Sequence, residues 1–155
     1  MGFNNILVVC VGNICRSPIA ATFLMDAYPD KHIESAGLSA VVGHGADSKA
    51  LDVMTAFNPT INANMNKHIA KQISEALTVK ADLILTMSTS QSKWIEDKWP
   101  HCRGKTFRIG YWIDQDIADP YGHDERAFET AKQNIIDSLG PVSYTHLTLP
   151  TILRV

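Results

Sequence analysis

Four short stretches of the chain have the hydrophobic pattern of β-strands. Residues 6–9 and 83–85 are continuous apolar runs, which are typical of strands buried on both faces of a parallel sheet. Residues 32–35 and 106–109 are weaker runs in which polar residues interrupt the apolar ones. The pattern therefore predicts a sheet of four strands.

Between and after these runs, apolar residues recur at the spacing of amphipathic helices. Residues that favour helix starts precede three of these segments, namely Ser17 with Pro18, Asp47 and Asp124. The expected helices cover residues 17–28, 47–57, 69–77, 90–99 and 124–139. Strands that alternate with helices predict an α/β fold: one three-layer domain over residues 1–141, with a four-stranded, mostly parallel sheet flanked by helices on both faces.

The composition is that of an ordinary globular protein, with 155 residues, 45% hydrophobic and 19% charged, and a net charge of −2. This charge gives no reason to expect nucleic acid as a partner, and no apolar run approaches the roughly 18 residues that span a bilayer. No signal peptide is indicated, and three cysteines are too few for a disulfide scaffold. We expect a cytoplasmic protein with reduced thiols and no membrane insertion.

The segment after the first predicted strand carries the most chemical information. It reads Cys-Val-Gly-Asn-Ile-Cys-Arg-Ser-Pro over residues 10–18, between a strand and a helix start, where parallel sheets bind ligands. Gly12 and Asn13 tolerate the positive φ of a loop that points its amides inward, and the helix N-terminus favours an anion there. The segment predicts a phosphate-binding loop made of Val11, Gly12, Asn13, Ile14, Cys15 and Arg16.

Two side chains of this loop suit chemistry on a bound phosphate. Arg16 offers a planar guanidinium that can hold two phosphate oxygens at once. The field that binds an anion also favours the thiolate of Cys10, and a thiolate is a nucleophile. A buried structural cysteine near a surface arginine would give the same two residues. The preceding strand, with Gly12, Ser17 and Pro18, favours the catalytic interpretation.

A thiolate that attacks phosphate needs an acid to protonate the departing oxygen. Asp119 is the candidate, because Pro120 holds it extended in the loop of residues 116–122. Near a phosphate dianion and a thiolate, a carboxyl group is favoured in its protonated form. An Asp-Pro pair is otherwise a common turn, and the Cys10 loop is what gives this pair a catalytic meaning.

Together with Asp119-Pro120-Tyr121, the Cys10 segment resembles the low-molecular-weight protein tyrosine phosphatases, over about residues 5–139. Residues 3–10 are most similar to the bacterial members that are encoded with exopolysaccharide or capsule systems. The resemblance implies hydrolysis of a phosphotyrosyl protein through a phosphocysteine, with inorganic phosphate as product and no metal or cofactor. It also implies, as the partner, a tyrosine autokinase that controls exopolysaccharide or capsule synthesis.

The resemblance also assigns a role to each residue around the loop. Cys10 would be the nucleophile, Arg16 the phosphoryl clamp, and Asp119 first the acid and then the base. Ser17 would donate to the Cys10 sulfur, and Asn13 would support the loop through Ser35 and His68. The pocket wall would consist of Leu38, Val41 and Tyr121. Cys15 would be a thiol that traps oxidised Cys10 in a disulfide. Taken singly, Ser35 is a strand-end serine and His68 a surface histidine.

Two further features bear on specificity and on the third cysteine. The lip of the pocket, residues 38–44, lacks the aromatic residue that eukaryotic members place there. We therefore expect contacts with the substrate protein to set specificity. Cys102 is interpreted as an incidental surface or packing cysteine, since His101 and Cys102 lack the further spaced ligands of a zinc site.

Three other functions share parts of this pattern. An arsenate reductase has the same fold and loop but passes a disulfide to further cysteines, and residues 81–90 contain none. A cysteine phosphocarrier of a sugar phosphotransferase system has no use for Asp119. A phosphotyrosine-binding module without catalysis would not need nucleophile, clamp and acid together.

The last residues do not fit the family pattern, which stops after Pro141. Residues 142–151 read Val-Ser-Tyr-Thr-His-Leu-Thr-Leu-Pro-Thr, similar to the conceptual translation of a transposase-based sequencing adapter. We expect residues 142–155 to be a non-native tail. A natural tail after a helix stop at Gly140-Pro141 is the alternative, and resequencing of the gene distinguishes the two.

Overall fold

The computed structural model describes the backbone of residues 3–60 and 62–146, and the side chains in those ranges as far as residue 142. The strands are β1 (Asn5–Cys10), β2 (His32–Gly37), β3 (Leu83–Thr86) and β4 (Thr106–Arg108). The helices are α1 (Arg16–Ala27), α2 (Ser48–Phe57), α3 (Asn62–Lys67), α4 (Glu75–Lys80), α5 (Thr89–Lys98) and α6 (Glu125–His146), with 3₁₀ turns at Pro100–Cys102 and Tyr111–Ile113. None of the described helices is long and apolar enough to cross a membrane.

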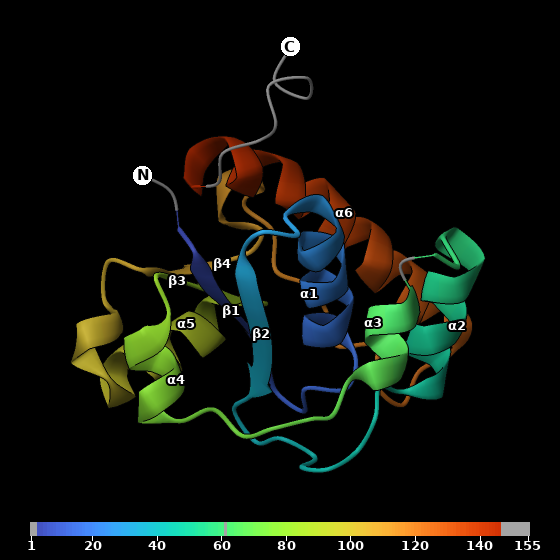
Figure 1. The fold of residues 1–155 in the computed structure, drawn as a ribbon, viewed down its shortest axis with the longest axis horizontal. Coiled ribbons are helices and arrows are strands. Elements are labelled where there is room, and N and C mark those ends of the chain that lie inside the picture. Colours follow the sequence, from blue (N-terminus) through green and yellow to red (C-terminus); the bar gives the residue numbers. More distant parts are fainter. Residues whose placement is uncertain (1–2, 61, 147–155) are drawn as a thin grey trace.

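The sheet is wholly parallel, with the strand order β2-β1-β3-β4 (Figure 1). β1 lies inside the sheet, with Cys10 opposite Gly37 of β2 and Val8 opposite Leu85 of β3. The loops that follow these three strands therefore meet at one edge of the sheet, which is where open parallel sheets bind ligands. The predicted fold class is confirmed.

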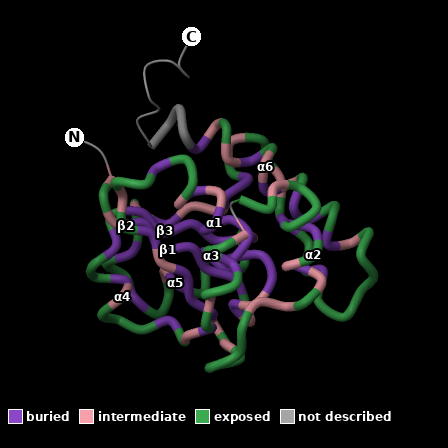
Figure 2. The backbone as a smooth tube through the Cα atoms, turned by 45° about the vertical axis from the view of Figure 1, so that its right-hand side comes forward, coloured by how far each residue is buried: buried purple, intermediate pink, exposed green. Residues whose placement is uncertain are grey.

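Helices cover both faces of the sheet, with α1, α2, α3 and α6 on one side and α4 and α5 on the other (Figure 1). Alternate residues of β1 divide between the two sides: Ile6 and Val8 belong to the larger core cluster, and Leu7 and Val9 to the smaller one. All four are buried, as the purple colour of the central strands shows in Figure 2. Burial on both faces explains why this strand is apolar at successive positions.

Two of the three predicted helix starts are confirmed. Oδ1 of Asp47 accepts a hydrogen bond from the Lys49 amide at 2.9 Å, and Oδ1 of Asp124 accepts one from the Ala127 amide at 3.2 Å. The third predicted helix is present as α1 and begins at Arg16, one residue early, but the prediction that Ser17 caps it was wrong, because no side chain caps α1. The Ser17 hydroxyl is bonded within the preceding loop instead.

The segment expected as a helix over residues 69–77 is mostly not helical. Residues 68–73, here called the strap, run beside the end of β2, where Gly37 and Gln72 form a parallel β-bridge. Helix α4 begins only after the strap. Ile69, which the helical spacing placed inward, is 67% exposed. The short helix α3 was not predicted, because its sequence has no apolar repeat and one buried residue.

Helix α6 continues past its predicted end. Phe128, Ala131 and Ile135 are buried as predicted, but the helix passes through Pro141, and Val142 is buried in the larger core cluster. Residues 147–155 lie outside the described residues. The foreign origin of residues 142–155 stays a prediction, which the gene sequence tests.

Candidate active site

The loop between β1 and α1 directs its carbonyl groups outward. Four of them accept hydrogen bonds of 2.8–3.0 Å from amides of other segments: Leu38 donates to Cys10, Ser39 to Val11, Val41 to Gly12 and Asp47 to Ile14. In a trans peptide the N–H group points away from the carbonyl, and no described peptide bond is cis. The amides that follow these carbonyls therefore face the inside of the loop, as the Asn13 amide does at 3.3 Å from the Cys10 Sγ.

Two backbone positions make this loop possible. Asn13 has a φ of 60°, the left-handed conformation predicted for it, whereas the same prediction was wrong for Gly12. Gly37, at the end of β2, has to be glycine because a Cβ there would lie 2.5 Å from the Val11 carbonyl oxygen. The end of β2 can thus approach the loop closely.

The Asn13 side chain connects the loop to three other segments. It is fully buried, and its Nδ2 donates to the Ser17 Oγ at 2.8 Å and to the Ser35 Oγ at 3.0 Å. Its Oδ1 accepts a hydrogen bond from the Lys71 amide of the strap at 2.9 Å. Both N–H groups and the oxygen of the amide are therefore used, so the side chain fixes the loop in one conformation.

His68 supports the same residue from the other side. Its Nε2 lies 2.6 Å from the Asn13 carbonyl oxygen. A carbonyl can only accept, so Nε2 carries the hydrogen. Burial lowers the pKa of His68, and Lys71 lowers it further, against the opposing effect of the bond to Asn13. The predicted grouping of Asn13, Ser35 and His68 is present in the structure, with a neutral His68 at pH 7.

The Cys10 sulfur has a hydroxyl partner. Sγ lies 2.9 Å from the Ser17 Oγ, and both residues are buried. The Asn13 Nδ2 donates to the Ser17 oxygen, and the Ser17 hydroxyl hydrogen is free to point at the sulfur when Cys10 is a thiolate. A donor in this position stabilises a thiolate. The structure therefore brings Ser17 to the place predicted for it.

Arg16 lies at the floor of the loop with its guanidinium buried. The residue is 5% exposed, and its Nη1 donates to the Ile117 carbonyl at 2.8 Å. Its Nε is buried and has no hydrogen-bond partner among the described residues. Such an orphaned donor is destabilising, and Nε and Nη2 together form the guanidinium edge that binds two oxygens of a phosphate. Nη1 anchors the side chain, and the Nε of this edge is left for an anion.

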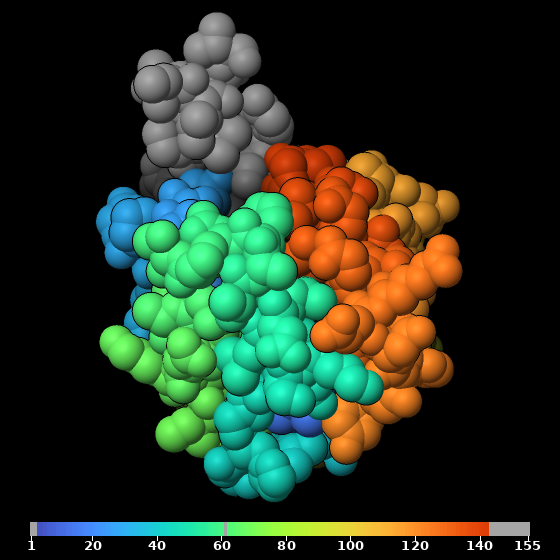
Figure 3. Space-filling model, turned by 90° about the vertical axis from the view of Figure 1, so that its right-hand side faces the viewer, coloured from blue at the N-terminus to red at the C-terminus, as the bar shows by residue number. Residues whose placement is uncertain are grey.

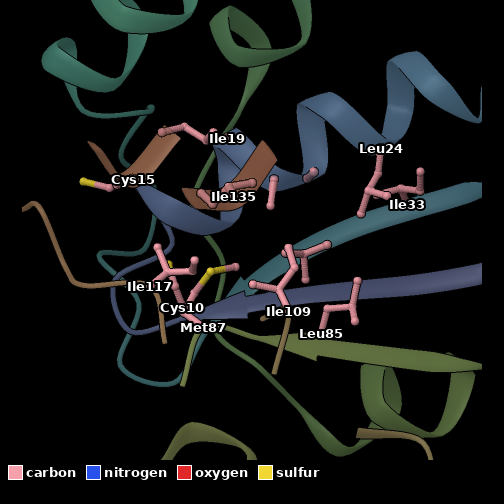
Figure 4. Packing of buried hydrophobic residues seen from close by; sticks show 14 of the residues in the cluster. Cys10, Cys15, Ile19, Leu24, Ile33, Leu85, Met87, Ile109, Ile117 and Ile135 are labelled. Carbon is pink, nitrogen blue, oxygen red and sulfur yellow. The ribbon is translucent and has the colours of Figure 1, made fainter. Parts of the chain in front are cut away.

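Asp119 reaches the loop from the far end of the chain, because the preceding segment is tied to the end of β3. The Ile117 amide donates to the Met87 carbonyl at 2.8 Å, and the Ile117 side chain is buried in the core cluster that contains Cys10 (Figure 4). The Asp119 carboxylate is half exposed, and its Oδ2 lies 3.8 Å from the Arg16 Nη2. The predicted acid therefore lies beside the predicted clamp.

A pocket opens above the loop, and its lining contains the predicted nucleophile, clamp and acid. It holds about 210 Å³ and is lined by Cys10, Val11, Gly12, Ile14, Cys15, Arg16, Ser39, Val41, Asp119 and Tyr121. Figure 3 shows this end of the molecule, with blue atoms of the N-terminal loop in a hollow between the cyan segment near residue 40 and the orange segment near residue 120. Pockets of this size admit one small group.

One predicted wall residue is placed elsewhere. Leu38 does not line the pocket, because its side chain packs against the smaller core cluster on the other face of the sheet. Ser39 takes its place in the lining, while Val41 and Tyr121 line the pocket as predicted. Along the lip, the side chains therefore change at residue 39 from packing in the core to lining the pocket.

The whole domain also matches a known family. The sequence profile described as low molecular weight phosphotyrosine protein phosphatase covers residues 5–143. The chain belongs to this family. It is a low-molecular-weight protein-tyrosine-phosphatase, as the resemblance of its motifs predicts.

Relatives and solved structures agree with this assignment. The chain is 50% identical over 129 residues to the low molecular weight protein-tyrosine-phosphatase Ptp of Acinetobacter johnsonii, covering 83% of this chain and 88% of that protein. It is 43% identical over 127 residues to Wzb of Escherichia coli K12, covering 81% and 84%. The structure of Vibrio vulnificus Wzb in complex with benzylphosphonate is similar with a TM-score of 0.84 at 38% identity, covering 92% of this chain and 99% of that chain.

The remaining cysteines of this phosphatase differ in position. Cys15 lies in the phosphate loop as a free, buried thiol, and burial, followed by the charges of Asp47 and Cys10, raises its pKa. Cys15 is therefore a thiol and not a thiolate at neutral pH. Cys102 is buried in the smaller core cluster, as expected for a packing cysteine.

Three contributions to the phosphatase site could not be predicted from residue types. Ile117 anchors Arg16 through its carbonyl, and Lys71 and Asp47 bind the loop through their amides. Every residue has these backbone groups, so no sequence signal distinguishes the ones that are used. Ser39 in the pocket lining was also missed, although it is the first polar residue of the predicted lip.

Proposed function

We propose that the protein hydrolyses phosphotyrosine in proteins through a phosphocysteine intermediate on Cys10. The observation that carries this proposal is the surroundings of the sulfur. The Ser17 hydroxyl lies at 2.9 Å and the Asn13 amide at 3.3 Å, and the unpartnered Nε of Arg16 lies on the same loop. Fixed donors of this kind stabilise a thiolate and the oxygens of a phosphoryl group as charge develops in the transition state.

In the first step the Cys10 thiolate attacks phosphorus on the side opposite the tyrosyl oxygen. The S–P bond forms, the P–O bond breaks, and Asp119 transfers its proton to the leaving phenolate oxygen. In the second step the Asp119 carboxylate takes a proton from water as the water oxygen attacks phosphorus. The S–P bond breaks, and inorganic phosphate leaves with the thiolate restored.

The acid role of Asp119 is testable with Asp119→Asn, which keeps the size of the side chain but cannot donate the proton. We expect kcat for a phosphotyrosyl peptide to fall by about 10²–10⁴, the usual contribution of a general acid. Asp52→Asn, an exposed aspartate on α2, is the matched control and should turn over normally. If the Asp119 variant turned over the peptide as fast as the wild type, Asp119 would not be the general acid.

Two other enzyme classes that fit the sequence are disfavoured by the structure. An arsenate reductase would need a thiol beyond Cys15 to pass a disulfide out of the loop, but Cys102, the third cysteine of the chain, is buried in the cluster on the opposite face of the sheet. A phosphocarrier would have to keep its phosphocysteine intact, whereas Asp119 lies beside Arg16, where it can activate water. Release of inorganic phosphate from a phosphotyrosyl peptide separates the hydrolase from both.

We further propose that the substrate is a tyrosine autokinase that controls exopolysaccharide or capsule synthesis, and that the protein acts in the cytoplasm. The similarity of residues 3–10 to that bacterial group and the Wzb name of two relatives support the substrate class. The cytoplasmic location is supported by the small number of cysteines, since three are too few for the disulfide scaffold of a secreted protein. A Cys10→Ser trap incubated with lysate should retain a tyrosine-phosphorylated kinase, and retention of unrelated phosphoproteins would contradict the substrate.

A further inference from the structure

We propose that an apolar collar around the pocket mouth binds apolar side chains next to the phosphotyrosine of the substrate chain, and that it disfavours acidic neighbours. This inference rests on the proposed function, since it concerns the polypeptide that carries the phosphotyrosine into the same pocket. The collar is defined by five exposed residues: Val11, Val41, Val42, Ile69 and Tyr121.

The first observation is where exposed apolar side chains gather. Val11, Val41 and Tyr121 line the pocket and are still 41%, 38% and 60% exposed, so they extend from its wall to the surface. Val42 and Ile69 are 66% and 67% exposed. Large apolar side chains grouped at a functional opening are typical of an interaction site, whereas single exposed ones are ordinary.

The second observation is that backbone hydrogen bonds hold the collar in place. The Val41 amide donates to the Gly12 carbonyl at 3.0 Å, which ties the lip to the phosphate loop. The Gly43 amide donates to the Ala70 carbonyl at 3.0 Å, and the Ala70 amide to the His44 carbonyl at 2.8 Å. These bonds hold the segments that carry Val42 and Ile69 side by side. A preorganised surface of this kind loses little entropy on binding.

The third observation is the lack of charge in these segments. Residues 10–15, 36–46 and 68–70 contain no Asp, Glu, Lys or Arg. Three lysines lie near the ends of these segments: Lys49 donates to the His123 carbonyl at 2.6 Å, Lys71 pairs with Glu34, and Lys67 is exposed at the end of α3. An acidic flank would therefore lose water at the apolar side chains of the collar, in segments that carry no cation of their own.

The occupant follows from the size of the pocket. A pocket of about 210 Å³ has room for a phosphotyrosyl side chain, and the main chain of the substrate then crosses the lip. An extended chain advances about 3.3 Å per residue, which brings the residues next to the phosphotyrosine onto the collar. Apolar side chains at those positions would cover the collar, and binding would be favoured because apolar surface is removed from water.

The test compares two peptides of equal length, with Leu and Ile or with Glu on both sides of one phosphotyrosine. The wild type should prefer the apolar peptide by about tenfold in kcat/KM, mainly through KM. Val42→Ser with Ile69→Ser should reduce this ratio to about one, and Val42→Lys with Ile69→Lys should reverse it. Val79→Lys is the matched control, because Val79 is 63% exposed on α4, and it should keep the wild-type ratio.

Three outcomes would overturn the collar. The wild type could show no preference or prefer the acidic peptide, or the collar variants could lower turnover of both peptides equally. Alternatively, sedimentation could show a dimer that the Lys pair dissociates, which would assign the surface to a second copy of the chain. Failure of the proposed function looks different, since neither peptide would then be hydrolysed.

Discussion

The phosphate loop, residues 10–16, and the collar share Val11 but are otherwise built in opposite ways. The loop buries polar groups: Asn13 is inaccessible to water, and its side chain donates to the hydroxyls of the buried Ser17 and Ser35. The collar exposes apolar groups, with Val42 and Ile69 about two-thirds accessible. Buried polar networks specify one geometry, whereas exposed apolar surface is available to a partner. The difference separates the chemistry, which the loop fixes, from recognition, which we assign to the collar.

The largest effect is expected from removal of the nucleophile, which tests whether the loop alone carries the chemistry. Cys10→Ser should reduce phosphotyrosyl turnover by at least about 10⁴, because a serine hydroxyl is a far weaker nucleophile than a thiolate. Binding of inorganic phosphate, measured by calorimetry, should persist because the amides and Arg16 remain. Loss of phosphate binding together with turnover would show that the loop depends on the sulfur for its shape.

Removing the centre of the polar network should affect stability as well as rate. Asn13→Ala deletes three side-chain hydrogen bonds and leaves buried partners on Ser17, Ser35 and the strap. We expect the free energy of unfolding in urea to fall by about 2–4 kcal/mol. Asn66→Ala, at an exposed position on α3, is the control and should change it by less than about 0.5 kcal/mol. If both variants lost a comparable free energy of unfolding, the stabilising role of the Asn13 network would be contradicted.

Oxidation tests whether the two thiols of the loop act together. Peroxide converts the Cys10 thiolate to a sulfenic acid, and the Cys15 thiol can then displace water to form a disulfide. Because burial raises the pKa of Cys15, we expect oxidation to begin at Cys10. A thiol reductant should restore peroxide-treated wild type, whereas Cys15→Ser should lose activity irreversibly. Cys102→Ser, in the smaller core cluster, is the control and should recover like the wild type.

The smallest expected effect is a pH dependence of the stability that Glu34 contributes through its ion pair with Lys71 of the strap. Burial alone would raise the pKa of Glu34, but hydrogen bonds from Lys71 and His32 lower it to about 2. A folded pKa below the unfolded value of about 4.3 gives stability that is present above that value and is lost as the pH falls towards 2. Glu34→Gln should therefore destabilise by about 1 kcal/mol at pH 7, after allowance for solvent screening, and by little at pH 2. Asp26→Asn, exposed on α1, is the control, and a Glu34 effect that did not change with pH would contradict the ion pair.

Much of the fold could be predicted because burial leaves a clear pattern. β1 and β3 are covered on both faces, so their apolar runs identify them, and Asp47 and Asp124 mark helix starts by ordinary capping. The strap could not be predicted in the same way. The spacing of Ile69 and Ile73 fits a helix, yet backbone bonds to β2 and to the lip hold this segment in place.

The site could be predicted as far as residue types carry the chemistry. A thiol, a guanidinium and a carboxylate have few alternatives for this reaction, and Cys10, Arg16 and Asp119 share one pocket. Ser17 was expected both to cap α1 and to donate to the Cys10 sulfur. Its hydroxyl lies beside the sulfur and does not cap the helix. Leu38 was misplaced because the sequence of the lip does not show where its side chains change from the core to the pocket.

The most direct test of the account is to locate the phosphate during turnover. Asp119→Asn slows hydrolysis of the intermediate as well as its formation, so the enzyme can be mixed with a phosphotyrosyl peptide, quenched within milliseconds and analysed by peptide mass spectrometry. We predict one phosphate per chain on Cys10, with none in Cys10→Ser. Tyrosine released without any phosphorylated Cys10, or phosphate carried by another residue, would contradict the phosphocysteine mechanism.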